Sequence, residues 1–466
     1  MAASVASRLF GSIGYIEDPD SLRFALSVAD TYSVAALQPH FPGYPVYWAV
    51  AKPLYLLTGH LSAAFALVGA LATVGLVAAG LSLLRAPLVS PRGVAWASGV
   101  LVCPLVWLLA TRYMPDLLGL AVALGALALA LRAMESGRAP EAAWAGAMGG
   151  LLAGLRLSYV PFVALPLLAL LARPRQRLPL VGAGLLATAL WLVPLVLDTG
   201  WTDLVQAAQR QTTGHFADFG GTIQSEDAGL GTRLWRTVES VWADGLGGWW
   251  AGRHPLTAVV GLALVLGLAS GAAEVARRVR ESDRAQRVAT WCLASGAAYA
   301  VWIVLFQNVV HKSRHALPLV ALALLVLALG VVRAWRVRGR WRVAARGVVV
   351  AGGAALAVVA VTLMAQHREP TAIAQVTVHT RAAVEAAPDL QIVTTPLVRY
   401  TLEQQGVRAA FVDATAPEAL ARLPQADLLA VGAAIPGREP VGVDTFYHNP
   451  FVNRMWAEIP VYRYAP

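Results

Sequence analysis

Residues 61–84 read LSAAFALVGALATVGLVAAGLSLL and contain no charged side chain. An α-helix rises about 1.5 Å per residue, so this run is long enough to cross the roughly 30 Å hydrocarbon layer of a bilayer. Its residues do not alternate between apolar and polar, as the strands of a membrane barrel would. The stretch therefore predicts a transmembrane helix. Predominantly apolar runs of similar length recur at 93–111, 115–133, 178–197, 255–274, 288–306, 316–334 and 347–366.

The composition agrees with a membrane protein. Of the 466 residues 57% are hydrophobic and 14% are charged, whereas soluble proteins average roughly 45–50% and about 25%. Cys103 and Cys292 both fall inside apolar runs, so they offer no disulfide framework and read as small packing residues.

The positive charge follows a pattern that argues against nucleic-acid binding. The net charge is +10, almost all of it arginine, because the only lysines are Lys52 and Lys312. The arginines gather in alternate loops between apolar runs, which is the pattern of cytoplasmic loops in membrane proteins. The remaining loops, including 17–60 and 198–254, are then expected outside, together with the C-terminal region. The arginine-bearing loops are 85–92, 132–138, 173–177, 277–287 and 333–346.

Residues 141–172 test this topology, because they are apolar throughout except for Arg156. A single crossing would place the arginines of 173–177 outside, opposite to those before residue 141. Two short crossings that turn at 156–159 keep both clusters on one side. We therefore expect a hairpin, whose short arms favour a position beside a water-filled cavity.

The two ends of the chain differ from the centre. Residues 1–16 are too short and too polar for a full span, which leaves open a shortened first helix or a start further upstream. After residue 366 the composition becomes that of a soluble domain. Its apolar runs alternate with helical stretches, a pattern that predicts a small parallel α/β sheet. The runs lie at 391–395, 409–413 and 428–432, and the helical stretches at 371–386, 397–405 and 416–422.

The loop at 17–48 reads EDPDSLRFALSVADTYSVAALQPHFPGYPVYW. Its acidic segment 18–21 (DPDS), followed by the turn 40–45 (HFPGYP), resembles the first extracytoplasmic loop of GT-C fold glycosyltransferases. The likeness is greatest to bacterial relatives of the protein O-mannosyltransferase and family-39 group, although Phe41 stands where their turn has its first proline. The segments 112–116 (RYMPD), 154–159 (GLRLSY) and 307–318 (QNVVHKSRHALP) fit the same resemblance, which covers about 15–366.

The resemblance implies an enzyme that takes sugar from a polyprenyl-phosphate-linked donor and passes it to an acceptor at the outer face. A fixed carboxylate serves as general base, and cationic side chains stabilise the departing phosphate. Asp20 matches the base because it precedes Ser21 as the family's acid precedes its polar neighbour. Asp18 is the alternative, and either acid also reads as the N-cap of a helix starting near Ser21.

The same resemblance assigns the other site residues. We expect Arg314, Lys312 and His311 to hold the donor phosphate, together with Arg156, whose burial inside the membrane would otherwise be costly. Interfacial snorkelling is the other interpretation of Arg314 and Lys312. The expected substrate contacts are His40, Tyr44, Arg112 and Asp116.

Two of these assignments have competing interpretations. Arg112 and Asp116 stand four residues apart, a spacing at which the two would pair with each other on one helix. His40 alone is compatible with a metal ligand or with a packed turn. No HxxxH or paired His-Asp spacing involves His40 to support a metal site there, so we expect no cofactor.

The sequence thus predicts a polytopic α-helical membrane protein with about 10–11 transmembrane helices of GT-C type over 1–366. A soluble α/β domain over 367–466 is expected on the outer face. The predicted location is the plasma or inner membrane, and the expected partners are the bilayer, the lipid-linked donor and an acceptor that is a protein, a glycan or a lipid. The competing functions are a transporter or lipid flippase and a scaffold protein, but the chain lacks the internal repeats typical of transporters.

Overall fold

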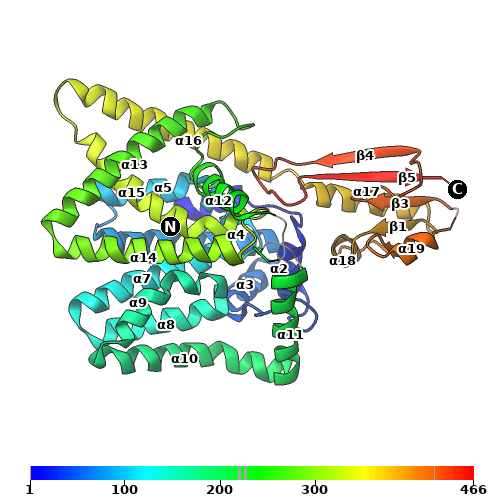
Figure 1. Ribbon diagram of the computed structural model, residues 1–466, viewed down its shortest axis with the longest axis horizontal. Helices are drawn as coiled ribbons and strands as arrows, with labels where there is room; N and C mark the ends of the chain where they lie inside the picture. Colours follow the sequence, from blue (N-terminus) through cyan, green and yellow to red (C-terminus); the bar gives the residue numbers. More distant parts are fainter. Residues whose placement is uncertain (1, 219–221, 225–227, 425, 466) are drawn as a thin grey trace.

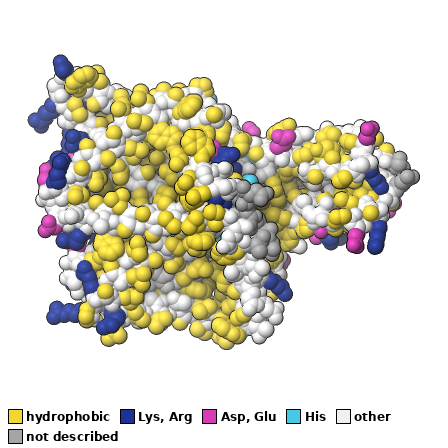
Figure 2. Space-filling view, in the orientation of Figure 1, with side chains coloured by type: hydrophobic (Ala, Val, Ile, Leu, Met, Phe, Trp, Pro, Cys, Tyr) yellow, Lys and Arg dark blue, Asp and Glu magenta, His cyan; other side chains and the backbone are white. Residues whose placement is uncertain are grey.

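The structure is a computed structural model that describes residues 2–218, 222–224, 228–424 and 426–465. Long helices lie side by side in one helical domain, and a smaller unit containing a β-sheet projects from one end of it (Figure 1). Hydrophobic side chains cover the flanks of the helical domain (Figure 2), as expected for a surface in contact with lipid.

The helices of the helical domain follow the apolar runs of the sequence. They are α1 (Ala2–Phe10), α2 (Pro19–Ala29), α3 (Pro45–Thr58), α4 (Leu61–Leu84), α5 (Pro91–Val102), α6 (Pro104–Thr111), α7 (Asp116–Ser136), α8 (Ala139–Arg156), η1 (Leu157–Tyr159), α9 (Val160–Leu171), α10 (Pro174–Thr199), α11 (Trp201–Thr213), η2 (Gly214–Asp218), α12 (Leu230–Glu239), η3 (Ser240–Gly245), α13 (Leu256–Glu281), α14 (Asp283–Phe306), η4 (Ser313–Ala316), α15 (Leu317–Trp335), η5 (Gly339–Trp341) and α16 (Arg342–His367).

Eight of the described helical segments are long and apolar enough to cross a membrane, and the bent pair α5–α6 makes a ninth. The bend of 58° falls at Cys103-Pro104, where proline lacks the N–H that a continuous helix requires. One of the eight segments, Ala139–Leu171, folds back on itself. Counted as two arms, this segment brings the candidates among the described residues to ten, the lower end of the predicted 10–11.

The hairpin predicted for 141–172 is confirmed. Arg156, at the end of α8, binds Asp116 at the start of α7, with 2.8 Å between NH2 and Oδ1. Arg173, just after α9, donates to the backbone carbonyl of Met134 at the other end of α7, at 2.6 Å. Midway, a Cβ on Gly149 would lie 3.1 Å from the side chain of Leu167. The two arms α8 and α9 therefore run in opposite directions along α7.

Small residues allow the helices to approach closely. A Cβ on Gly146 of α8 would stand 2.0 Å from the carbonyl oxygen of Leu180 in α10, and one on Gly330 of α15 would stand 1.8 Å from that of Gly267 in α13. Such close backbone contact is the usual basis of helix association in membranes, where apolar burial alone provides little attraction. These two contacts fix α8 against α10 and α15 against α13.

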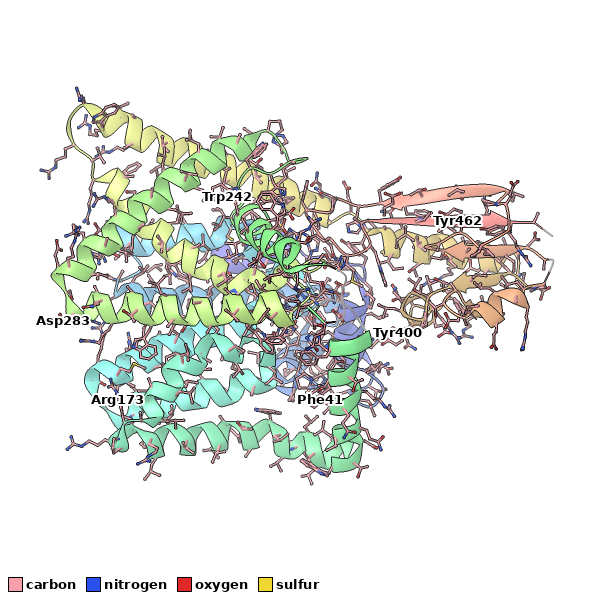
Figure 3. The ribbon with its side chains drawn as sticks, viewed as in Figure 1. Phe41, Arg173, Trp242, Asp283, Tyr400 and Tyr462 are labelled. Atoms are coloured by element: carbon pink, nitrogen blue, oxygen red, sulfur yellow. The ribbon has the colours of Figure 1, made fainter. Side chains whose placement is uncertain are left out.

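The arginine-bearing loops gather at one end of the helical domain, which we call the arginine end. Arg85 and Arg284 both bind Glu135, and Arg333 lies 3.6 Å from Glu274. Lys and Arg side chains line this end in Figure 2, and Figure 3 labels Arg173 and Asp283 there, far from the sheet. The opposite end, next to the C-terminal unit, is called the site end below.

The C-terminal unit combines α17 (Ala372–Ala386), α18 (Pro396–Gln404) and α19 (Pro417–Ala421) with a five-stranded sheet in the order β2-β1-β3-β5-β4. Parallel strands β1 (Gln391–Thr394), β2 (Ala410–Asp413) and β3 (Leu428–Val431) match the three predicted runs. The sequence analysis missed β4 (Gly442–Tyr447) and β5 (Glu458–Tyr464), which pair antiparallel with each other and extend the sheet beyond β3. The sheet is therefore mixed rather than wholly parallel.

Candidate active site

The predicted acids lie at the start of α2, at the site end. Asp18 caps this helix: its Oδ1 accepts a hydrogen bond from the backbone N–H of Ser21 at 2.7 Å, and Pro19 takes the first helical position. Proline suits that position because its missing N–H has no partner within the helix. The cap fixes Asp20 in the first turn of α2, where its side chain leaves the helix toward η4.

Asp20 meets both predicted cations of the loop before α15. Its Oδ2 accepts from Lys312 Nζ at 2.8 Å and from Arg314 NH2 at 2.6 Å. Arg314 also lies 3.9 Å from Asp18 Oδ2. The Arg314 side chain is 7% exposed and that of Asp20 is 15% exposed, so the pairing is largely withdrawn from water. We call Asp18, Asp20, Lys312 and Arg314 the charge cluster.

Neighbouring groups hold Arg314 in place. Its NH1 lies 2.7 Å from the sulfur of Met114, and the backbone carbonyl of the next residue, His315, accepts from the Tyr299 hydroxyl at 2.8 Å. α15 begins directly afterwards, with proline among its first residues. The guanidinium is therefore anchored by the helix packing, which a side chain that only snorkels does not require.

The two acids of the charge cluster have opposite electrostatic environments. Burial raises the pKa of Asp18, and the negative charge of Asp20 raises it further. Burial alone would also raise the pKa of Asp20, but the Lys312 ammonium and the Arg314 guanidinium together hold it well below its usual range. At neutral pH Asp20 is therefore ionised, and its carboxylate binds the side chains of Lys312 and Arg314.

A second buried ion pair lies close by. Asp116 and Arg156 meet at 2.8 Å, and the guanidinium lies 5.6 Å from the centre of the Tyr159 ring. Tyr44 is within electrostatic range of this pair and also of Asp20 and Arg314. The structure thus brings α2, the α6–α7 loop, the α8–α9 turn and η4 together around Tyr44.

The turn at 40–45 supplies the remaining predicted contacts. His40 Nε2 and the Tyr44 hydroxyl are 3.1 Å apart, and Phe24 of α2 packs edge-on against both rings. Burial lowers the pKa of His40 to about 3, so this imidazole is neutral at physiological pH. It can exchange hydrogen bonds with a substrate but adds no positive charge.

Arg112 is not part of this cluster, and it does not pair with Asp116. Its NH2 lies 2.7 Å from Glu17 Oε1, and it also donates to the backbone carbonyl of Val452. Glu17 is fully buried, and its Oε1 accepts a hydrogen bond from Asn453 Nδ2 at 3.2 Å. Burial alone would raise the pKa of Glu17, but the positive charges around it, chiefly that of Arg112, lower the pKa to about 2. Arg112, a predicted substrate contact, therefore lies in a junction between the helical domain and the C-terminal unit.

Other predicted and missed residues lie at the edge of the charge cluster. His311 is exposed on the turn before η4. Arg23, which the sequence analysis overlooked, lies 3.6 Å from Asp20 and 5.3 Å from the ring centre of Tyr400 in α18. The sequence did contain a signal for this contact, because Arg23 stands three residues after Asp20, a spacing at which two side chains meet on one face of a helix. Among the described residues no group of three or more His, Cys, Asp or Glu side chains is placed to hold a metal ion.

Known structures share this architecture. The crystal structure of ArnT from Cupriavidus metallidurans bound to undecaprenyl phosphate aligns with a TM-score of 0.57 at 12% sequence identity, and the alignment covers 99% of this chain and 96% of that one. The same protein in its apo state aligns with a TM-score of 0.55 at 13% identity, with the same coverage. No family model matches the sequence, and a search of curated proteins finds no match. At such low identity the likeness shows the fold alone, and it confirms the predicted architecture: this chain is a polytopic helical membrane protein with the GT-C fold of ArnT.

Proposed function

We propose that this protein is a glycosyltransferase that moves a hexosyl or pentosyl group from a polyprenyl-phosphate-linked donor to an acceptor at the extracytoplasmic face of the cell membrane. The observation that carries the proposal is the charge cluster, in which a carboxylate and two cations meet at the site end. The undecaprenyl phosphate in the ArnT structure is a lipid of the donor's class. The acceptor is a protein, a glycan or a lipid.

The cations suit the leaving group. During transfer the bond between the anomeric carbon and the phosphate oxygen breaks, and negative charge grows on that phosphate. Arg314 stays charged at any working pH, and its planar guanidinium can grip two phosphate oxygens at once. Lys312 adds a point charge beside it, 2.8 Å from the same carboxylate oxygen. The buried Arg156, which pairs with Asp116 beside the charge cluster, is a further candidate for binding the donor phosphate.

Asp20 serves as the general base. As the acceptor oxygen forms its bond to the anomeric carbon, its proton passes to the Asp20 carboxylate and polyprenyl phosphate departs. Both cations donate to Asp20 Oδ2, which makes this carboxylate a weak base. A donor phosphate competes for Lys312 and Arg314, so its arrival raises the basicity of Asp20. Donor binding and base activation are thereby coupled.

The remaining side chains shape the substrate pocket. Tyr44 and the neutral His40 offer hydrogen bonds to sugar hydroxyls, and Asp116 keeps Arg156 oriented. None of these groups requires a metal ion or an organic cofactor for the proposed step. His311 lies at the exposed edge, where it is a further candidate for binding the donor phosphate.

The membrane orientation follows from charge. Cytoplasmic loops are enriched in arginine and lysine, so the arginine end faces the cytoplasm. The site end and the C-terminal unit then face outward, where a lipid-linked donor presents its sugar to acceptors of the cell envelope.

The test is transfer in vitro, with purified protein, a panel of polyprenyl-phosphate sugars and acceptor-containing membrane extract. Asp20→Asn is expected to lower turnover by roughly 10²–10⁴-fold, because the amide cannot take up the proton. Asp30→Asn is the matched control, since Asp30 ends the same helix in an exposed position. Activity lost in Asp18→Asn but kept in Asp20→Asn would move the base to Asp18. Normal turnover in both would contradict the transferase.

A further inference from the structure

A cavity lies at the arginine end, away from the charge cluster. It has a volume of about 1,050 Å³ and opens between α13, α14 and α15 beside the end of α4. This volume is at the upper limit of typical ligand pockets. The rim and the walls of the cavity differ sharply in chemistry, and each indicates a different part of one ligand.

The rim is positively charged. Five arginines line it against a single carboxylate, Glu281; they are Arg85, Arg92, Arg277, Arg278 and Arg284. Glu135 and Glu274, just outside the rim, bind four of these arginines. Five guanidinium groups therefore share three carboxylates. The rim therefore carries a net positive charge, which an anionic ligand would neutralise.

Among the five rim arginines, Arg92 is the one that binds neither Glu135 nor Glu274. It is partly buried at the start of α5, and it makes no hydrogen bond or ion pair with any residue that the structure describes. Its electrostatic neighbours are three cations, Arg277, Arg278 and Arg336, and one carboxylate, that of Glu274, which already binds Arg277 and Arg278. The like charges repel one another, and an anion bound between them would relieve that repulsion.

The walls of the cavity are apolar and follow the helix axes. On α14 they extend from Arg284 to Ala300, a length of about 24 Å at 1.5 Å per residue. Leu293, in the middle of this wall, is 73% exposed. A charged rim at the end of a groove of this depth matches a phosphate at the membrane surface with an acyl chain below it.

We propose that this cavity binds an anionic glycerophospholipid of the leaflet at the arginine end, with its phosphate among Arg92, Arg278 and Arg284 and an acyl chain along α14. The phosphate that reacts must lie at the site end, so a donor lipid does not explain cations at the opposite end. Free phosphate would leave the apolar walls empty. The site is independent of the transfer reaction proposed above.

The test is native mass spectrometry of the full-length protein in detergent, titrated separately with phosphatidylglycerol, phosphatidylcholine of the same acyl chains, undecaprenyl phosphate and inorganic phosphate. We expect one phosphatidylglycerol to bind in preference to phosphatidylcholine and inorganic phosphate, whereas undecaprenyl phosphate, which the charge cluster is proposed to bind, should bind wild type and Arg92→Gln equally. Arg92→Gln should weaken phosphatidylglycerol binding about tenfold, whereas Arg175→Gln should leave it unchanged, because Arg175 is exposed at the same end but outside the cavity.

A second pair of variants tests the apolar wall. Ala297→Trp places an indole in the groove and should weaken phosphatidylglycerol binding as strongly as Arg92→Gln. Leu186→Trp, at an exposed position of α10, is its control. Equal binding of phosphatidylcholine, tighter binding of inorganic phosphate, weaker binding of undecaprenyl phosphate in Arg92→Gln, or equal behaviour of each variant and its control would overturn the proposal.

Discussion

Asp18 and Asp20 are two residues apart, yet they do different work in the structure. Asp18 satisfies the backbone N–H of Ser21 and so positions the helix start. Asp20 meets the two cations that arrive from η4. Because asparagine caps a helix as well as aspartate does, Asp18→Asn preserves α2, and any loss of transfer in that variant would reflect chemistry rather than folding.

The pH dependence of transfer is a prediction about Asp20. Lys312 and Arg314 hold its pKa well below the usual range, so the acid limb of kcat/KM that Asp20 controls lies below the pH range in which an aspartate usually titrates. Removing one cation in Lys312→Gln raises that pKa, and the acid limb moves to higher pH. A pH profile of kcat/KM measures the shift.

Lys52→Gln is the matched control for this profile. Lys52 is the other lysine of the chain; it donates to the carbonyl of Val28 at 2.7 Å rather than to a carboxylate. Its substitution should leave the acid limb in place. If the acid limb is also unchanged in Lys312→Gln, the Lys312 ammonium does not set the pKa of Asp20 in the working enzyme.

Among the elements, the hairpin of α8 and α9 depends on contacts that no local pattern encodes. Its first arm is held by α10, where Gly146 lies against the Leu180 carbonyl. Its turn places Arg156 beside Asp116. A weaker contact between α8 and α10 is therefore expected to shift Arg156 at the site end as well as the helix interface itself.

The stability of this interface provides an element-scale prediction. In Gly146→Ala the new methyl group would stand 2.0 Å from a backbone oxygen, so the helices must separate. Overpacking of this kind typically costs about 1–3 kcal/mol. Gly182→Ala is the control, because a Cβ there meets no atom within 4 Å and alanine favours the helix. Thermal unfolding in detergent should show a lower Tm for Gly146→Ala only; equal Tm values would argue against the tight α8–α10 contact.

For the whole molecule, the junction around Glu17 joins the two parts of the chain. Glu17 receives Arg112 from the helical domain and Asn453 from the C-terminal unit. Glu17 directly precedes Asp18, so the same segment carries the junction and the start of the charge cluster. The C-terminal unit is thereby held over the site end, where Arg23 of α2 also meets Tyr400 of α18.

The orientation of the molecule is tested by cysteine labelling in intact cells. With Cys103 and Cys292 replaced by alanine, Glu418→Cys on the C-terminal unit should react with a membrane-impermeant thiol reagent. Arg175→Cys at the arginine end should react only after the membrane is permeabilised. Both positions are exposed. Labelling of residue 175 in intact cells, or protection of residue 418, would reverse the proposed orientation.

The sequence by itself determined the spans, the arrangement of the arginine loops at one end and the capped helix that presents the acids. These features are local: hydrocarbon accepts only backbone that satisfies its own hydrogen bonds, so apolar length predicts helices directly. The first three strands of the sheet were also visible as short apolar runs, whereas β4 and β5 lacked a clear pattern because their residues alternate only partly between buried and exposed.

Only the tertiary structure decided which charges meet. Asp20 and its cations are separated by 292 and 294 residues, and helix packing alone brings them together. The spacing of Arg112 and Asp116 suggested a pair, but α6 ends at Thr111 and α7 begins at Asp116. Without a continuous helix the two side chains do not share a face. Asp116 then pairs with Arg156 and Arg112 with Glu17, because each buried charge binds the nearest opposite charge that the fold supplies.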